Sequence, residues 1–156
     1  MQEPTVDSPG VIVFPPLLAL ATILIGVGAH YLQPVPISPR LPLRAIGAVL
    51  ALAGPSIALS ARAQMVRAGT NVNPSLPATA IVTGGPYRFT RNPMYLSLCL
   101  LNLGIGLLLC DLTPAVLTIP LAAILNFGVI AREERYLERK FGDEYSAYRG
   151  HVRRWL

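Results

Sequence analysis

The chain has 156 residues, of which 53% are hydrophobic and only 13% are charged, and it carries a net charge of +5. Soluble domains carry about 25% charged residues, so this composition excludes an ordinary soluble domain. The basic residues do not form a stripe interleaved with aromatic residues, so we expect contact with anionic lipid headgroups and not with nucleic acid.

The apolar residues are gathered in four blocks that contain no Asp, Glu, Lys or Arg: Val11–Leu32, Ala45–Ala61, Met94–Cys110 and Leu112–Ala131. A membrane-spanning helix needs about 20 apolar residues, within a range of roughly 17–25. A chain of this length cannot bury four such helices beneath a soluble shell. We therefore predict an all-α integral membrane fold in one domain, residues 1–156, with transmembrane helices at about residues 11–32, 44–61, 93–110 and 113–131.

The segments between the predicted spans carry helix breakers and caps. Met1–Gly10 is acidic, unlike the basic start of a cleavable signal peptide, so we expect the first span to be retained. Four prolines predict a stiff, extended loop at Gln33–Pro42, and Pro55 predicts a kink in the second span. Asp111 or Thr113 can cap the fourth span after a tight hairpin.

The fourth span is followed by a run of helix formers without Gly or Pro, which predicts a cytoplasmic helix that ends at Gly142, within a cytoplasmic segment 132–156. With four spans, eleven Lys and Arg residues lie on one side of the membrane and only Arg40 and Arg44 lie on the other. The positive-inside rule then places both termini in the cytoplasm, with the chain in a bacterial inner membrane.

The segment Thr79–Tyr95 is the richest in candidate site residues. Within it, Gly-Gly-Pro at 84–86 predicts a turn, and Asn92 with Pro93 begins the third span. Polar and small residues then recur on one helical face, at positions 92, 95, 99, 102 and 106. Such a stripe faces either a neighbouring helix or a cavity, and the pattern leaves both interpretations open. Asn92 and Tyr95, at the cytoplasmic end, are the better site candidates.

Three motifs together resemble one family of membrane enzymes. They are GPYR-x-x-RNPMY at 85–95, REE at 132–134 and FGDEYSAYR at 141–149. In their order and spacing they resemble the isoprenylcysteine carboxyl methyltransferases and the related membrane phospholipid N-methyltransferases, over roughly Thr70 to Arg154. The prenylcysteine enzymes typically have His where this chain has Asn92, whereas Asn is common there in the phospholipid branch.

The resemblance implies methyl transfer from S-adenosylmethionine and assigns roles to named residues. Arg132 would hold an anionic acceptor, and Glu133 would bind the cofactor, orient Arg132 or act as a base for an amine acceptor. The implied cofactor-binding residues are Thr79, Ile81, Val82, Tyr87, Arg91, Asn92, Pro93, Met94, Tyr95 and Glu134. No metal site is expected, because Cys99 and Cys110 have no partners at metal-ligand spacing.

The sequence does not identify the molecule that accepts the methyl group. By resemblance we expect a lipophilic acceptor such as an isoprenylcysteine-type carboxylate, with membrane lipids as surroundings. The first alternative is a phospholipid or other small-molecule N-methyltransferase. The others are an oxidoreductase related to sterol reductases and a non-catalytic membrane scaffold. Outside the motifs, His30 is expected to pack at the outer interface, and the basic tail with Arg153, Arg154 and Trp155 is expected to anchor the chain to lipid headgroups.

Overall fold

The computed structural model describes residues 7–38 and 40–156. Within these residues the chain is helical and has no strand, only an isolated bridge between Pro36 and Asp111. The helices are α1 (Pro15–Leu32), α2 (Arg40–Arg67), η1 (Gly85–Arg88), α3 (Pro93–Leu109), α4 (Leu112–Val116), α5 (Thr118–Ile124), η2 (Leu125–Ile130), α6 (Ala131–Phe141) and α7 (Asp143–His151).

The predicted all-α fold is confirmed, and three of its helices are long and apolar enough to cross a membrane: α1, α2 and the continuous helix Leu112–Phe141. α3 is apolar but has only 17 residues. Two helices differ in length from the predicted spans. α1 begins at Pro15, and Pro15 and Pro16 lie in its first turn, where the missing proline N–H is not needed. α2 extends beyond both predicted ends, so Pro42 lies in its first turn and not in an extended loop.

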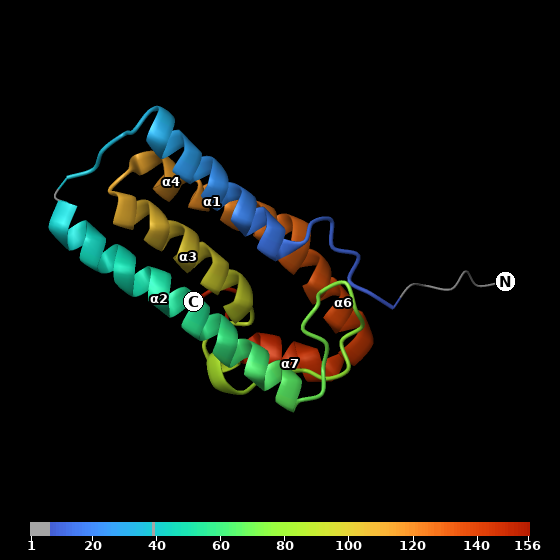
Figure 1. Ribbon diagram of the computed structural model, residues 1–156. Coiled ribbons are helices and arrows are strands. Elements are labelled where there is room, and N and C mark those ends of the chain that lie inside the picture. Colours follow the sequence, from blue (N-terminus) through green and yellow to red (C-terminus); the bar gives the residue numbers. More distant parts are fainter. Residues whose placement is uncertain (1–6, 39) are drawn as a thin grey trace.

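α3 lies between α2 on one side and α1 on the other (Figure 1). Small residues let α2 and α3 approach closely. A Cβ atom on Gly104 would stand 2.5 Å from the Ala51 nitrogen, and one on Gly47 would stand 2.6 Å from the Leu108 nitrogen. Contact of this kind, backbone against backbone, is the usual way in which helices pack inside a bilayer. The α2–α3 pair is therefore tightly packed, and one end of each helix lines the site described below.

The hairpin between α3 and α4 is fixed by Asp111, which is fully buried. Its carboxylate accepts the Thr113 N–H at 2.9 Å, which confirms the predicted cap, and it also accepts the Val35 N–H at 3.1 Å. His30 Nδ1 lies 2.8 Å from the same carboxylate. His30 thus fastens the end of α1 to the hairpin.

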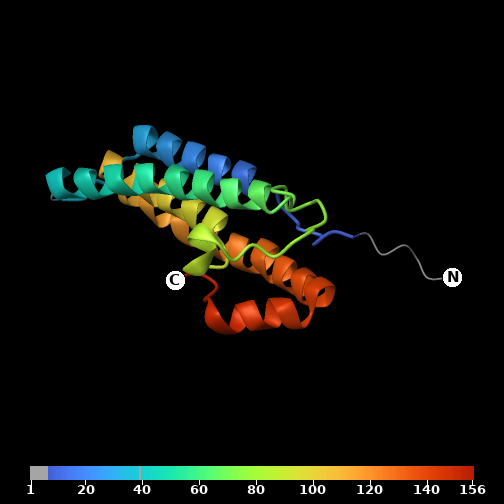
Figure 2. The same ribbon diagram turned by 90° about the horizontal axis from the view of Figure 1, so that it is seen from below.

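The helix Leu112–Phe141 contains a π-helical stretch, η2, and ends at Gly142, as predicted, with φ at 52°. α7 then folds back beneath α6 (Figure 2), and the tail returns to the start of α3. The Arg154 carbonyl accepts hydrogen bonds from Thr90 Oγ1 and Asn92 Nδ2. The prediction of a headgroup anchor was wrong for Arg154 and Trp155, whose side chains bind Asn126 in η2.

Candidate functional site

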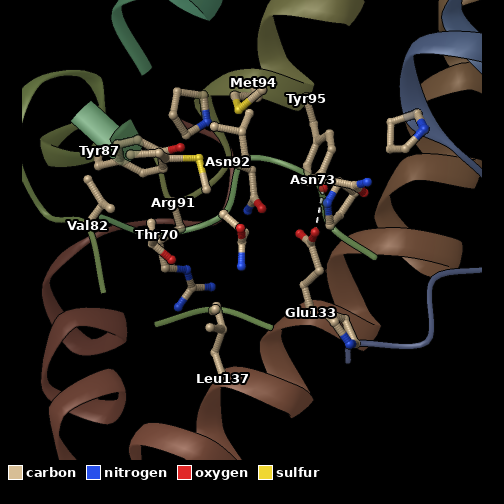
Figure 3. Close-up of a pocket in the computed structure, with 18 of the residues that line it drawn as sticks. Thr70, Asn73, Val82, Tyr87, Arg91, Asn92, Met94, Tyr95, Glu133 and Leu137 are labelled. Atoms are coloured by element: carbon tan, nitrogen blue, oxygen red, sulfur yellow. Dashed lines mark hydrogen bonds between the residues drawn. The ribbon is translucent and has the colours of Figure 1, made fainter. Parts of the chain in front are cut away.

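A cavity of about 550 Å³ lies where the ends of α1, α2 and α3 meet α6, α7 and the segment 68–84 (Figure 3). That segment, green in Figure 1, crosses from α2 to α6, where the Tyr136 hydroxyl accepts the Ala78 N–H at 3.1 Å. Most of the lining is apolar. Its charged residues are Arg91, Glu133 and Glu134.

One wall is the turn that joins η1 to α3. Gly85 has φ at 58°, a conformation that favours glycine, and a Cβ atom there would stand 3.0 Å from the Gln64 side chain of α2. Tyr87 is buried behind this turn, and its carbonyl accepts the Tyr148 hydroxyl at 2.8 Å. Pro93 then begins α3 and orients the Asn92–Tyr95 stretch toward the cavity.

Tyr95 and Glu133 meet across the cavity. The Tyr95 hydroxyl donates to Glu133 Oε1 at 2.6 Å, and Figure 3 shows the two side chains pointing toward each other. Hydrogen bonds from a hydroxyl to a carboxylate are short and strong. No Arg or Lys pairs with Glu133 within the described residues. Glu133 is therefore the acidic group of the cavity that has no cationic partner within these residues.

Glu134 has the opposite environment, between two arginines. Arg154 donates through Nε to Oε1 at 3.2 Å and through Nη2 to Oε2 at 2.5 Å. Arg91 Nη2 lies 2.9 Å from Oε1. The Glu134 side chain is 8% exposed and that of Arg91 is 9% exposed, so these two are largely withdrawn from solvent, whereas the Arg154 side chain is 36% exposed. A buried carboxylate requires such partners.

One nitrogen of the Arg91 guanidinium has no hydrogen-bond partner in the part of the chain that the structure describes. Its Nε atom is buried and has no hydrogen-bond partner among residues 7–38 and 40–156. Leaving a buried donor unsatisfied costs about 1–3 kcal/mol, and more for a charged group. A guanidinium with a spare donor at the edge of a cavity is suited to an anionic ligand group.

The aromatic side of the cavity stays neutral. Burial raises the pKa of the Tyr145 phenol to about 12 and raises those of Tyr87 and Tyr148 further. At neutral pH these groups are therefore protonated and can act as hydrogen-bond donors. They supply apolar surface and a polar tip, as is common for walls around a planar ligand.

Most of the residues predicted from the sequence line this cavity: Ile81, Val82, Tyr87, Arg91, Asn92, Pro93, Met94, Tyr95, Glu133 and Glu134. Two do not. Thr79 is exposed and donates its hydroxyl to the Gly69 carbonyl. Arg132 points to the outer side of α6, where it donates to the Gly10 carbonyl and lies beside Arg135 and Arg139.

Sequence reasoning missed other parts of the cavity. The segment 70–76 and the residues Phe14–Pro16 line it without a recognisable motif. Tyr145 and Tyr148 carried a usable signal, because they are three apart and therefore share one face of α7. Arg154 carried none, because a basic residue near the end of a membrane protein resembles a headgroup contact.

The deeper half of the α3 stripe is used for helix packing. Cys99 lies in the apolar core with Leu121 and Leu125. Asn102 accepts the Thr118 hydroxyl at 3.4 Å and donates to Thr22 at 2.6 Å. Only the start of the stripe, Asn92 and Tyr95, reaches the cavity. Within the described residues, no three His, Cys, Asp or Glu side chains are grouped as metal ligands.

Comparison with known proteins agrees with the site. The model of a family described as phospholipid methyltransferase matches residues 43–144, well over half of the chain. An uncharacterized protein of Haemophilus influenzae is 49% identical over 63 residues, which are 40% of this chain and the whole of that protein. The matched range contains both the Tyr87–Tyr95 wall and the Glu133–Glu134 pair. The chain belongs to the phospholipid methyltransferase family and is a membrane methyltransferase.

Proposed function

We propose that the chain transfers a methyl group from S-adenosylmethionine to a lipophilic acceptor that carries an amine or another protic nucleophile. The observation that carries this proposal is the apolar cavity in which the Tyr95–Glu133 pair lies opposite the Arg91–Glu134 pair. Bound S-adenosylmethionine supplies the methyl group on a sulfonium, which is already an activated donor.

The cavity suits that cofactor in size and in chemistry. About 550 Å³ falls within the range of small-molecule sites, roughly 300–1,000 Å³. The adenosine requires apolar walls, which Ile81, Val82 and Met94 provide. The carboxylate of the cofactor requires a cationic donor, and Arg91 has an unused Nε. We propose that Glu134 takes part by orienting Arg91.

The charges in the cavity favour one class of acceptor. Arg91 and Arg154 leave one positive charge after they pair with Glu134, and we assign that charge to the carboxylate of the cofactor. Glu133 has no cationic partner within the described residues, and Arg132 lies outside the cavity. A carboxylate acceptor would therefore be repelled by the Glu133 carboxylate and would meet no further cation among the residues that line the cavity. An amine-bearing lipid or similar molecule meets no such repulsion. We therefore prefer the N-methyltransferase alternative over an isoprenylcysteine-type carboxylate.

Glu133 is the group that we propose as the proton acceptor. A neutral amine nitrogen that gains a methyl group would become positively charged and would have to lose a proton. Its proton then passes to the Glu133 carboxylate, which Tyr95 holds in place. Methyl transfer otherwise depends on alignment and on the exclusion of water, which the buried walls provide.

We propose that the cavity opens toward the cytoplasm, with four spans and both termini on that side of a bacterial inner membrane. The cofactor would enter from the cytoplasm. A lipid acceptor would enter sideways from the bilayer between α1 and α2, because Phe14–Pro16 of one and Ala58 and Met65 of the other line the cavity.

The test is methyl transfer by purified protein from radiolabelled S-adenosylmethionine into a membrane-lipid extract. We expect label on an amine-bearing lipid and a rate at least about 100-fold lower for Glu133→Gln, because a general base contributes 10²–10⁴-fold. The control is Glu138→Gln, since Glu138 is exposed and pairs with Arg149. Label in a base-labile methyl ester would contradict the amine assignment, and an unchanged rate in Glu133→Gln would remove Glu133 as the base.

A further inference from the structure

Glu134 is buried between two arginines, and these three side chains together carry a net charge of +1. Arg91 and Arg154 carry two positive charges and Glu134 carries one negative charge. Arg154 contacts both oxygens of Glu134, whereas Arg91 contacts only Oε1 through Nη2. The unused donor of the group is Arg91 Nε. One positive charge with a spare donor therefore remains beside the cavity.

Arg154 is held in this position by several elements. Its backbone carbonyl accepts hydrogen bonds from Thr90 and Asn92, directly before α3. Its Nη1 donates to Asn126 Oδ1 at 3.2 Å, and the Trp155 indole donates to the same oxygen at 3.2 Å. Asn126 lies in the π-helical stretch η2, a feature that is frequent at functional sites. The C-terminal tail thus places a guanidinium on Glu134 with defined geometry.

We propose that Arg154 is a positioning residue that occupies the Glu134 carboxylate and so leaves Arg91 free to bind the carboxylate of the cofactor. This inference rests on the proposed function, because it takes S-adenosylmethionine as the ligand. Its physical basis is competition between two cations for one buried anion. Arg–carboxylate pairs are frequently bidentate, and a bidentate pair with Glu134 would use the donors that Arg91 needs for the ligand.

Removal of Arg154 changes this balance. In Arg154→Gln, the remaining Arg91 and Glu134 carry opposite charges and satisfy each other, so the carboxylate of the ligand meets a neutral pair. In the double variant Glu134→Gln/Arg154→Gln, Arg91 has lost its competitor and again offers a net positive charge. Loss of affinity in the single variant and recovery in the double variant is therefore the signature of the proposed role, and a purely structural role predicts no such recovery.

The experiment measures binding of two probes to the purified, detergent-solubilised full-length protein by calorimetry. The first probe, S-adenosylhomocysteine, has the amino-acid carboxylate, and the second, methylthioadenosine, lacks it. We expect Arg154→Gln to weaken binding of the first probe by about tenfold or more, and that of the second by less than about twofold. We expect the double variant to bind S-adenosylhomocysteine at least about threefold more tightly than Arg154→Gln, although Glu134 no longer orients Arg91.

The matched control is Arg153→Gln, which removes the same charge from the exposed neighbouring side chain and should bind both probes as the wild type does. A double variant that binds S-adenosylhomocysteine no better than Arg154→Gln would overturn the inference, as would equal weakening of both probes. Wild-type protein that binds neither probe would instead remove the proposed function. Thermal unfolding of each variant without ligand is followed in parallel. If Arg154→Gln unfolds at a lower temperature than the wild type, the affinity of the double variant is compared directly with that of the wild type.

Discussion

At the scale of single residues, the two adjacent glutamates of α6 have different environments. Glu134 is surrounded by Arg91 and Arg154, whereas Glu133 faces Tyr95 and the cavity. The REE motif predicted that both carboxylates belong to the site, and both line the cavity. It could not tell them apart, because the second arginine comes from the tail, 20 residues further along the chain.

The Tyr95 hydroxyl is the residue-scale feature that we expect to matter most for the rate. Tyr95→Phe removes one hydrogen bond to a carboxylate, an interaction worth about 1.5–3 kcal/mol, so we expect methyl transfer to slow by about tenfold or more. Steady-state rates of methyl transfer measure this. Tyr31→Phe is the control, because Tyr31 is 79% exposed at the far end of α1. Equal rates for Tyr95→Phe and the wild type would show that the hydrogen bond does not orient the base.

At the scale of elements, the helices follow from the apolar blocks, and the errors occur at their ends. The Pro-rich loop was predicted as extended up to Pro42, but proline is tolerated in the first turn of a helix, and α2 includes it. The return of the tail could not be predicted. Its hydrogen bonds use backbone carbonyls, which every residue has, and so the tail leaves no pattern in the sequence.

The crossing of α2 and α3 gives a prediction about stability. Gly104→Ala places a Cβ atom 2.5 Å from the Ala51 nitrogen, so the two helices must separate, and overpacking of this kind typically costs about 1–3 kcal/mol. We expect a lower free energy of unfolding and a lower melting temperature in detergent. Gly28→Ala in α1 has nothing within 4 Å of the added atom and should not destabilise the protein. If both variants have the same melting temperature as the wild type, the close crossing of α2 and α3 is absent in the purified protein.

At the scale of the whole molecule, composition and charge predicted the helical membrane fold, and the family resemblance predicted about a third of the residues that line the cavity, including all three charged ones. Thr79 and Arg132 are the exceptions, since one faces solvent and the other binds Gly10 outside the cavity. The contributions of residues 14–16 and 70–76 to the cavity could not be predicted, because neither segment belongs to a recognisable motif.

The orientation of the molecule can be measured with single cysteines at exposed positions. We expect Gln33→Cys to react with a membrane-impermeant maleimide on intact spheroplasts, and Glu144→Cys to react only after the membrane is opened. The wild type serves as the blank, because Cys99 and Cys110 are buried. Labelling of Glu144→Cys on intact spheroplasts would reverse the proposed topology and place the cavity on the wrong side for the cofactor.

The most direct test of the central claim is equilibrium binding of radiolabelled S-adenosylmethionine to the purified protein. Val82 lines the cavity, and Val49 is 65% exposed on the outer face of α2. If the cofactor occupies the cavity, the wild type and Val49→Trp bind it alike, and Val82→Trp, which places a bulky side chain in the wall of the cavity, binds it at least about tenfold more weakly. Absence of binding by the wild type, or equal binding by all three proteins, would contradict the placement of the cofactor in this cavity.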